Sequence, residues 1–203
     1  MRRGLLGGTF DPIHMGHLII AEQVRSQLAL DRIDFVPVGV PWMKRGEKIL
    51  PGFHRVAMVE LALEGNRDLS VLTLEVDRPG DTFTVDTLEE LHETVDDTLF
   101  FIMGMDTLQG FSKWKSPKRI LDLATLVVVR RPRFPRVRLD KIETLAPGSS
   151  DRIVEVGAPL MDISSTDIRQ RVVEGRSIQY LVPERVRGYI QELGLYRDPL
   201  SKE

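Results

Sequence analysis

The stretch Gly7-Gly8-Thr9-Phe10-Asp11-Pro12-Ile13-His14-Met15-Gly16-His17 decides the fold, because it joins a short apolar strand to a helix. The strand is predicted over residues 3–7. The residues after the stretch repeat at the spacing of one helix face, namely Leu18, Ala21, Val24 and Leu28. A strand that ends in glycines and leads straight into a helix indicates a phosphate-binding junction.

The two histidines of this junction, His14 and His17, are expected in the first turn of the helix. Backbone N–H groups without intrahelical partners and the positive end of the helix dipole favour an anionic ligand there. Gly7 and Gly8 are expected to let the chain turn sharply and a ligand approach the backbone. Gly16 is expected to clear space between the two imidazoles.

Two other readings of the histidine pair are a solvated surface pair and half of a metal site. A zinc site needs three or four ligands, and the chain adds only His54 and His92 and no cysteine. No protein metal ligand is therefore assigned. A P-loop is excluded because no glycine is followed by lysine, and Gly4, Gly7 and Gly8 do not form the dinucleotide fingerprint.

Composition bounds the class of protein. The chain has 203 residues, 42% hydrophobic and 29% charged, with a net charge of −2, which argues against disorder and against nucleic-acid binding by bulk charge. The lack of cysteine fits a reducing cytoplasm. No signal peptide and no apolar run long enough for a membrane span are seen. The expected partners are small molecules and, as a homo-oligomer, further copies of the chain, without nucleic acid or membrane.

Apolar strands alternate with helices along the chain. Strands are predicted over 3–7, 33–38, 69–76, 99–103 and 126–129, with helices between them over 53–63 and 84–92. This order predicts one Rossmann-like α/β domain over 1–203, with a central parallel sheet flanked by helices. Ligands of such sheets bind at the carboxyl ends of the strands. Lys44, Gly104–Asp106 and Arg130 follow strands and should converge there with Gly7–His17.

The C-terminal part, from about 164 to 203, is predicted to be helical. Ser165-Thr166-Asp167 reads as the capping sequence of a helix that ends at Gly175, and Pro183 opens a last helix to about Leu193. Thr84 or Asp86 is expected to cap the helix over 84–92. The basic stretch 130–138 is most simply a surface loop, and contact with substrate or with another subunit is the alternative.

A second motif, Ile163-Ser164-Ser165-Thr166-Asp167-Ile168-Arg169, stands about 150 residues after His14-Met15-Gly16-His17. Together the two resemble the signatures of a nucleotidyltransferase superfamily. Further stretches resemble bacterial nicotinate-nucleotide adenylyltransferases over nearly the whole chain; they are Gly8–His14, Thr82–Thr87, Gly104–Asp106, Trp114 and Arg130–Pro132. The sequence departs from that family at Met43, where the family often has histidine before Lys44, and at Arg133-Phe134, where it commonly has Gly-Tyr.

The resemblance implies transfer of AMP from ATP to nicotinic acid mononucleotide, giving deamido-NAD and pyrophosphate in NAD biosynthesis. Mg²⁺ is implied as the partner of ATP, held largely through phosphate oxygens and water. The alternatives are a transferase of the same superfamily that acts on nicotinamide mononucleotide or phosphopantetheine, and a non-catalytic nucleotide-binding module. A dinucleotide-dependent dehydrogenase is disfavoured because its glycine fingerprint is missing.

The resemblance also implies site residues. The catalytic set is His17, His14, Lys44 and Arg169. The ATP-binding set is Gly8, Thr9, Phe10, His14, Gly16, His17, Gly104, Asp106, Ile163, Ser164, Ser165, Thr166 and Arg169. The nicotinate-nucleotide set is Thr82, Thr84, Trp114, Lys44 and Arg130. Simpler readings are a solvated lysine at 44, an ordinary helix cap at 164–166, a strand exit at 104–107 and a half-buried packing tryptophan at 114.

Overall fold

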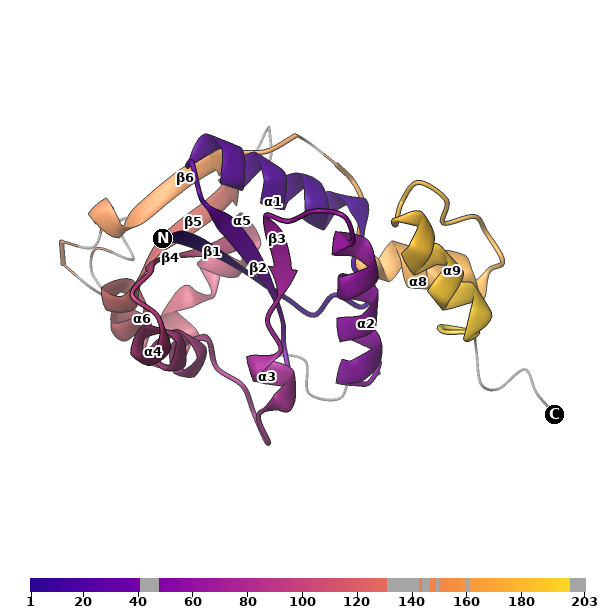
Figure 1. Ribbon diagram of the computed structural model, residues 1–203, viewed down its shortest axis with the longest axis horizontal. Coiled ribbons are helices and arrows are strands. Elements are labelled where there is room, and N and C mark those ends of the chain that lie inside the picture. Colours follow the sequence, from indigo (N-terminus) through magenta and orange to yellow (C-terminus); the bar gives the residue numbers. More distant parts are fainter. Residues whose placement is uncertain (41–47, 131–142, 144–146, 149, 160, 198–203) are drawn as a thin grey trace.

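The computed structural model describes residues 1–40, 48–130, 143, 147–148, 150–159 and 161–197. Six parallel strands form one sheet in the order β3-β2-β1-β4-β5-β6 (Figure 1). The strands are β1 (Arg2–Gly8), β2 (Arg32–Pro37), β3 (Leu69–Val71), β4 (Thr98–Gly104), β5 (Ala124–Arg130) and β6 (Ile153–Gly157). The predicted parallel sheet is confirmed.

Helices connect the strands and flank the sheet. They are α1 (Met15–Gln27), α2 (Gly52–Leu63), α3 (Leu74–Asp77), α4 (Thr84–Thr94), α5 (Met105–Gln109), α6 (Pro117–Leu123), α8 (Ser165–Val173) and α9 (Glu184–Glu192), with short 3₁₀ turns η2 (Phe111–Lys113) and η3 (Ser150–Arg152). Figure 1 shows α8 and α9 beside α2, on the side of the molecule away from α4 and α6. In the described part of the chain, no helix is long and apolar enough to cross a membrane.

The sheet carries a hydrophobic core on each face, which explains why its strands read as unbroken apolar runs. In β4, Phe100 and Ile102 pack in the core with α1, α2 and the C-terminal helices, whereas Phe101 and Met103 pack in the core with α4 and α6. The alternation follows from the strand, whose successive side chains point to opposite faces.

The strand order places a switch point at β1. Its two neighbours, β2 and β4, lie on opposite sides of it. The chain first builds β2 and β3 on one side of β1 and then crosses back to build β4, β5 and β6 on the other side. In sheets of this kind the helices after the two central strands diverge and leave a crevice at the carboxyl ends. The junction that follows β1 therefore lies at the edge where a ligand is expected.

Several local predictions are wrong. The strand predicted over 69–76 ends at Val71, because β3 is an edge strand that pairs only with β2, and a helical turn begins at Leu74. Strand β6 and helix α6 were not predicted. No side chain caps α4: its N-cap is Phe83, and Asp86 instead forms an ion pair with Lys115 at 2.8 Å.

Candidate active site

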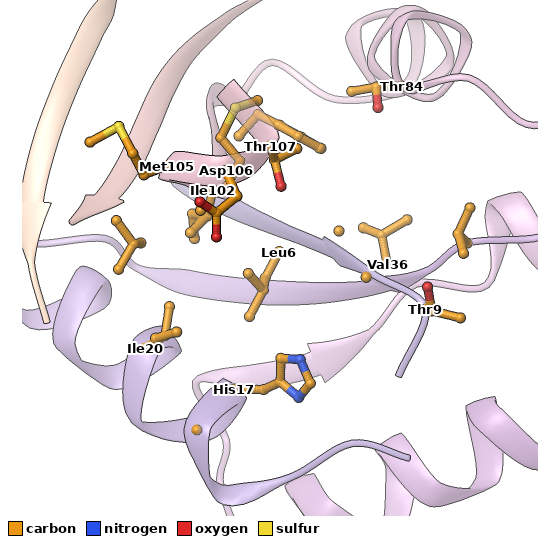
Figure 2. A pocket seen from close by; sticks show the side chains of 18 of the residues that line it. Leu6, Thr9, His17, Ile20, Val36, Thr84, Ile102, Met105, Asp106 and Thr107 are labelled. Carbon is orange, nitrogen blue, oxygen red and sulfur yellow. The ribbon is translucent and has the colours of Figure 1, made fainter. Parts of the chain in front are cut away.

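A cavity of about 480 Å³ opens at the carboxyl ends of the central strands. Gly7 and Gly8 of β1, Val36 of β2 and Gly104 of β4 line it. Figure 2 shows His17 pointing into it from the first turn of α1, with Asp106 and Thr107 on the opposite wall. The sequence prediction that the stretches after β1 and β4 meet at this edge is confirmed by their shared cavity.

The imidazoles of His14 and His17 stack with their ring centroids 3.7 Å apart. His14 is the N-cap of α1 and His17 is the third residue of the helix. The backbone N–H of His14 donates to Nδ1 of His17 at 3.2 Å. Because Nδ1 accepts this bond, the proton of a neutral His17 lies on Nε2, which leaves His17 with an N–H donor at the other side of the ring.

The charge state of His17 follows from its surroundings. Burial lowers the pKa of His17 well below the usual value for histidine, and the adjacent His14 lowers it further. At neutral pH, His17 is therefore an uncharged donor until a ligand enters. A phosphate placed against the ring would favour the charged form, because an opposite charge nearby raises the pKa of an imidazole.

The ring of His17 rests edge-on against Phe10, with centroids 5.0 Å apart. Phe10 is only 1% exposed, so its side chain is part of the core and supports His17. A Cβ on Gly8 would come within 2.8 Å of the Phe10 ring, and one on Gly16 within 3.0 Å of Nδ1 of His14. The expected role of Gly16, space for the imidazoles, is borne out.

The prediction that Gly7 and Gly8 make the turn is wrong. Both are residues of β1, and the positive φ after the strand belongs to Phe10, at 49°. Gly7 has the same steric role as Gly8, since a Cβ on it would come within 3.1 Å of the ring of Phe101. The glycines make room for aromatic rings of the protein.

The backbone donors at the start of α1 are also less available than predicted. The N–H of Met15 donates to the carbonyl of Leu181 at 2.8 Å, and that of His17 donates to the carbonyl of His14 at 2.9 Å. These two N–H groups are engaged within the protein. An anion at this helix start would depend more on the imidazole side chains than the sequence suggested.

The second motif lies directly against the first. Ser164 is the N-cap of α8, and its hydroxyl accepts from the N–H of Asp167 at 3.1 Å. The hydroxyl of Ser165 donates to the carbonyl of Pro12 at 2.9 Å, and Nη1 of Arg169 donates to the carbonyl of Asp11 at 2.7 Å. The two motifs thus form one site.

A smaller polar cavity of about 170 Å³ lies between the two motifs. It is lined by Thr9, Phe10, Asp11, His17, Ile49, Ser165, Thr166 and Arg169. His17 also lines the larger cavity, as do His14, Gly16, Ile163, Ser164 and Ser165. His17 therefore stands between a large, mostly apolar space and a small space with hydroxyl and guanidinium donors.

Thr82, Thr84 and Trp114 line the far part of the large cavity, as the resemblance implies. Trp114 packs edge-on against Phe101, with centroids 6.0 Å apart, and also contacts Phe111. Its indole Nε1 is buried and has no hydrogen-bond partner within the described residues. Trp114 is thus both a packing residue and a donor at the wall of the cavity.

Sequence reasoning missed Glu75, which lines the same part of the cavity. It is 7% exposed and accepts a hydrogen bond from Oγ1 of Thr87 at 3.0 Å. Burial raises the pKa of the Glu75 carboxyl, and the hydrogen bond from Thr87 opposes that effect. The available signal was a lone carboxylate within the apolar run 69–76.

Sequence reasoning also missed Arg55, whose guanidinium is buried behind the junction. Arg55 is 2% exposed and sits on the buried face of α2. It donates to four carbonyl oxygens, those of Thr9 (2.9 Å), Val38 (2.7 Å), Gly39 (3.2 Å) and Leu50 (2.9 Å). A charged residue among the apolar positions of a helix was the signal for it.

The remaining predicted residues differ in outcome. Gly104 and Asp106 line the large cavity, at the start of α5. Arg130 is not among the lining residues described; its Nε lies 3.6 Å from a carboxylate oxygen of Glu155 on β6. Lys44 and Met43 lie outside the described residues, as does the basic stretch 131–138. Among the residues that the structure does describe, no three His, Asp or Glu side chains cluster as a metal site.

Comparison with known proteins shows the family to which the chain belongs. The model of the family described as cytidylyltransferase-like matches residues 5–171. A probable nicotinate-nucleotide adenylyltransferase from Roseiflexus sp. is 45% identical over 194 residues, 96% of this chain and 97% of that protein. A protein of the same name from Thermomicrobium roseum is 46% identical over 97% of this chain and 92% of its own length.

A solved structure has the same fold. The Plasmodium falciparum nicotinic acid mononucleotide adenylyltransferase complexed with NaAD matches 96% of this chain and 97% of its own with a TM-score of 0.78. The two sequences are 18% identical, so this similarity supports the fold alone.

Proposed function

This chain belongs to the cytidylyltransferase-like family and, within it, to the nicotinate-nucleotide adenylyltransferases, and we propose that it transfers AMP from ATP to nicotinic acid mononucleotide. The products are deamido-NAD and pyrophosphate. One observation carries the proposal: His17 lines both a small polar cavity that suits a pyrophosphate group and a large, mostly apolar cavity that suits the nucleoside and pyridine parts of the substrates.

In the proposed reaction, a phosphate oxygen of the mononucleotide attacks the α-phosphorus of ATP. The new P–O bond forms as the bond to the pyrophosphate breaks. No general base is required, because the second pKa of such a phosphate is about 6 and the nucleophile is already ionised at neutral pH. The protein has to align the two phosphates and stabilise the charge that develops.

His17 is proposed to donate from Nε2 to the α-phosphate. The hydrogen bond from the backbone of His14 fixes its ring, so the donor is oriented before the ligand arrives. His14 is proposed to contact the phosphates from the loop side. Lys44 remains a proposed second cation at the reacting phosphates.

The pyrophosphate part of ATP is proposed to bind in the small cavity. The hydroxyls of Ser165 and Thr166 and the guanidinium of Arg169 line it. A guanidinium has five N–H donors, so the bond from Arg169 to the Asp11 carbonyl leaves others for phosphate oxygens. Thr9, Gly104, Asp106 and the other predicted ATP-site residues complete the proposed ATP site.

Mg²⁺ is proposed to bind together with ATP. The small cavity offers the guanidinium of Arg169, whose N–H groups suit phosphate oxygens, and Asp106 is a carboxylate at the wall of the large one. The residues present fit an ion held mostly by phosphate oxygens and water, with few protein ligands. When bound, the ion would neutralise charge on the phosphates of ATP.

The pyridine ring is proposed to bind in the far part of the large cavity. Thr82 and Thr84 at the start of α4 and the ring of Trp114 support this assignment. Arg130 stays a prediction for the acceptor site, although it pairs with Glu155 in the structure.

The test is to incubate the pure protein with ATP, Mg²⁺ and a panel of acceptors, and to identify the adenylylated product. The panel contains nicotinic acid mononucleotide, nicotinamide mononucleotide and phosphopantetheine. Formation of deamido-NAD with release of pyrophosphate supports the proposal. A product only from another acceptor would reassign the substrate, and no product from any acceptor would favour a non-catalytic nucleotide-binding module.

A further inference from the structure

The turn between β1 and α1 is held in shape by side chains from distant parts of the chain. The carbonyl of Thr9 accepts from Arg55, that of Asp11 from Arg169 and that of Pro12 from Ser165. The donors come from α2 and α8. The shape of this turn therefore depends on hydrogen-bond donors that other elements supply.

The side chain of Asp11 is the centre of this arrangement. Asp11 is 2% exposed, and a buried carboxylate is costly unless it accepts hydrogen bonds. Its Oδ1 accepts from the hydroxyl of Tyr196 at 2.7 Å, and its Oδ2 accepts from the N–H of Leu50 at 3.4 Å. The bond from Tyr196 is the shorter of the two.

The charge of Asp11 also has a cationic neighbour. Burial lowers the pKa of Arg55, and the negative charge of Asp11 opposes this. Asp11 therefore has an opposite charge behind the turn and a neutral donor at its side.

Tyr196 reaches Asp11 from the segment that follows α9. Burial raises the pKa of the Tyr196 hydroxyl, and the carboxylate of Asp11 raises it further, so the hydroxyl stays protonated and donates. Hydrogen bonds with a charged partner are shorter and stronger than neutral ones. The bond joins residues 185 positions apart in the sequence.

We propose that Tyr196 is a positioning residue of the phosphate site: its hydroxyl fixes the carboxylate of Asp11. Through Asp11 it fixes the turn that leads to His14 and His17 and that holds Arg169 by the Asp11 carbonyl. Tyr196 lines neither cavity described above, so its proposed route to the ligands is its hydrogen bond to Asp11, which lines the small cavity. The inference rests on the proposed function in the experiments that measure adenylyl transfer.

The first experiment compares Tyr196→Phe with Tyr189→Phe. Tyr189 is the matched control: it also comes from the C-terminal part, its hydroxyl lies 2.9 Å from Nδ1 of His54, and it lines neither cavity. Each variant loses one hydroxyl. We expect Tyr196→Phe to lower kcat about tenfold, the effect of one charge-assisted hydrogen bond, with thermal stability close to that of Tyr189→Phe, whose kcat stays at the wild-type value.

A second experiment needs no catalytic activity. Amide hydrogen exchange of residues 9–14 should be faster in Tyr196→Phe than in the wild type, and unchanged in Tyr189→Phe. If Tyr196→Phe shows the faster exchange at residues 9–14 but the wild-type protein has no transferase activity, the proposed function is overturned and the positioning role is still supported. Unchanged exchange and unchanged kcat in Tyr196→Phe would overturn the positioning role.

A double variant separates positioning from simple stabilisation. If Tyr196 acts through the carboxylate, adding Tyr196→Phe to Asp11→Ala, which has no side-chain acceptor, should lower kcat no further than Asp11→Ala alone. If the two losses multiply, the hydroxyl acts by another route and the proposal is wrong.

Discussion

At the residue scale, the stacked pair of His14 and His17 sets the charge of the site before any ligand binds. Two imidazoles with centroids 3.7 Å apart disfavour a second positive charge, and burial disfavours the first on His17. The site therefore offers His17 as a neutral donor with a defined tautomer. Such a donor binds an anion without the cost of stripping water from a charged ring.

Replacing His17 by alanine should lower kcat by about 10²-fold or more, the usual effect of losing one donor that stabilises transition-state charge. Folding should be little changed, because the core beneath His17 is filled by Phe10. Steady-state kinetics and a thermal melt check this. The control is His92→Ala, an exposed position in the last turn of α4; near-normal turnover of a folded His17→Ala protein would contradict the assignment.

The protonation of His17 gives a second prediction. Its pKa is lowered on folding, so below the ordinary histidine pKa of about 6.5 the unfolded state takes up a proton that the folded state resists. The contribution of His17 to stability is constant above that pH and falls as the pH drops below it. Nuclear magnetic resonance titration should find the His17 pKa well below 6.5 without ligand and higher with an ATP analogue bound. A titration near 6.5 that is insensitive to the analogue would refute both the burial and the phosphate contact.

Arg169→Ala tests the small cavity. A charge-assisted contact is worth roughly 1.5–3 kcal/mol, so the KM for ATP should rise about ten- to a hundredfold. The matched control is Arg171→Ala on the same helix, since Arg171 pairs with Asp167 at 2.7 Å and lines neither cavity. If only the KM for the mononucleotide rises, Arg169 belongs to the acceptor site.

At the scale of elements, helices α3 and α4 meet through a buried carboxylate. Glu75 of α3 accepts from Thr87 of α4, and Arg78 donates to the same hydroxyl at 3.2 Å and to Glu90 at 2.6 Å. This polar cluster supports the start of α4, where the predicted nicotinate pocket lies. Its stability should depend on pH, because burial raises the pKa of Glu75.

The sign of that dependence follows from the direction of the shift. Between the ordinary glutamate pKa of about 4.3 and the raised pKa of Glu75, the folded state binds more protons than the unfolded state. Stability linked to Glu75 is therefore present at low pH and is lost as the pH rises through this window. Glu75→Gln should remove this decrease in stability, because glutamine does not ionise.

Thermal melts from pH 4.5 to pH 7.5 measure this effect. As the pH rises, the melting temperature of Glu75→Gln should increase relative to that of the wild type. In a chain of this size, each kcal/mol of unfolding free energy that the wild type loses corresponds to about 2–4 °C. Exposed Glu60→Gln on α2 is the control. Parallel curves for Glu75→Gln and the wild type would show that Glu75 is not protonated in the fold.

The elements themselves show how far a sequence predicts structure. The inner strands were predictable because both of their faces are buried and their apolar runs are unbroken. The edge strands were predicted less well. The strand predicted at β3 was too long, since β3 pairs over only three residues, and β6 was missed, since its short run contains the exposed Glu155. Short helices such as α5 and α6 have too few residues for a helical period to emerge.

Site residues could be predicted where they belong to a local sequence motif. They could not be predicted where their role comes from contacts with residues distant in the sequence. The two motifs could be found because their histidines and hydroxyls stand at helix starts and the arginine follows one turn into the second helix. Arg55 and Tyr196 could not, because their roles depend on carbonyl and carboxylate oxygens that approach only after folding. The same limit hid Glu75.

At the scale of the whole molecule, the two cavities are assembled from both ends of the chain. The large one is walled by the exits of β1 and β4 and by α4, and the small one is closed by α8, which returns to the turn after β1. In the proposed assignment, the acceptor spans from the wall beside α4, where its ring is placed, to His17, where its phosphate reacts. The same assignment puts the choice between acceptors at the wall beside α4, away from the reacting atoms.

That wall is rich in donors. No side chain caps α4, so the positive end of its dipole faces the cavity at Thr84, and the buried indole N–H of Trp114 has no partner in the described part of the chain. The opposing group is Glu75, a carboxyl that lines the same cavity and whose pKa is raised by burial. A carboxylate, which only accepts hydrogen bonds, suits such a wall better than an amide, whose NH₂ would face other donors.

The acceptor preference should follow from this wall: kcat/KM should favour nicotinic acid mononucleotide over nicotinamide mononucleotide by about ten- to a hundredfold, the range for charge-assisted hydrogen bonds. Side-by-side kinetics on the two acceptors measure it. Because ionised Glu75 would repel a carboxylate and accept from an amide, the preference should narrow as the pH rises and should stay constant in Glu75→Gln. An equal or reversed preference at neutral pH would contradict the donor wall, and with it the position of the pyridine ring beside α4.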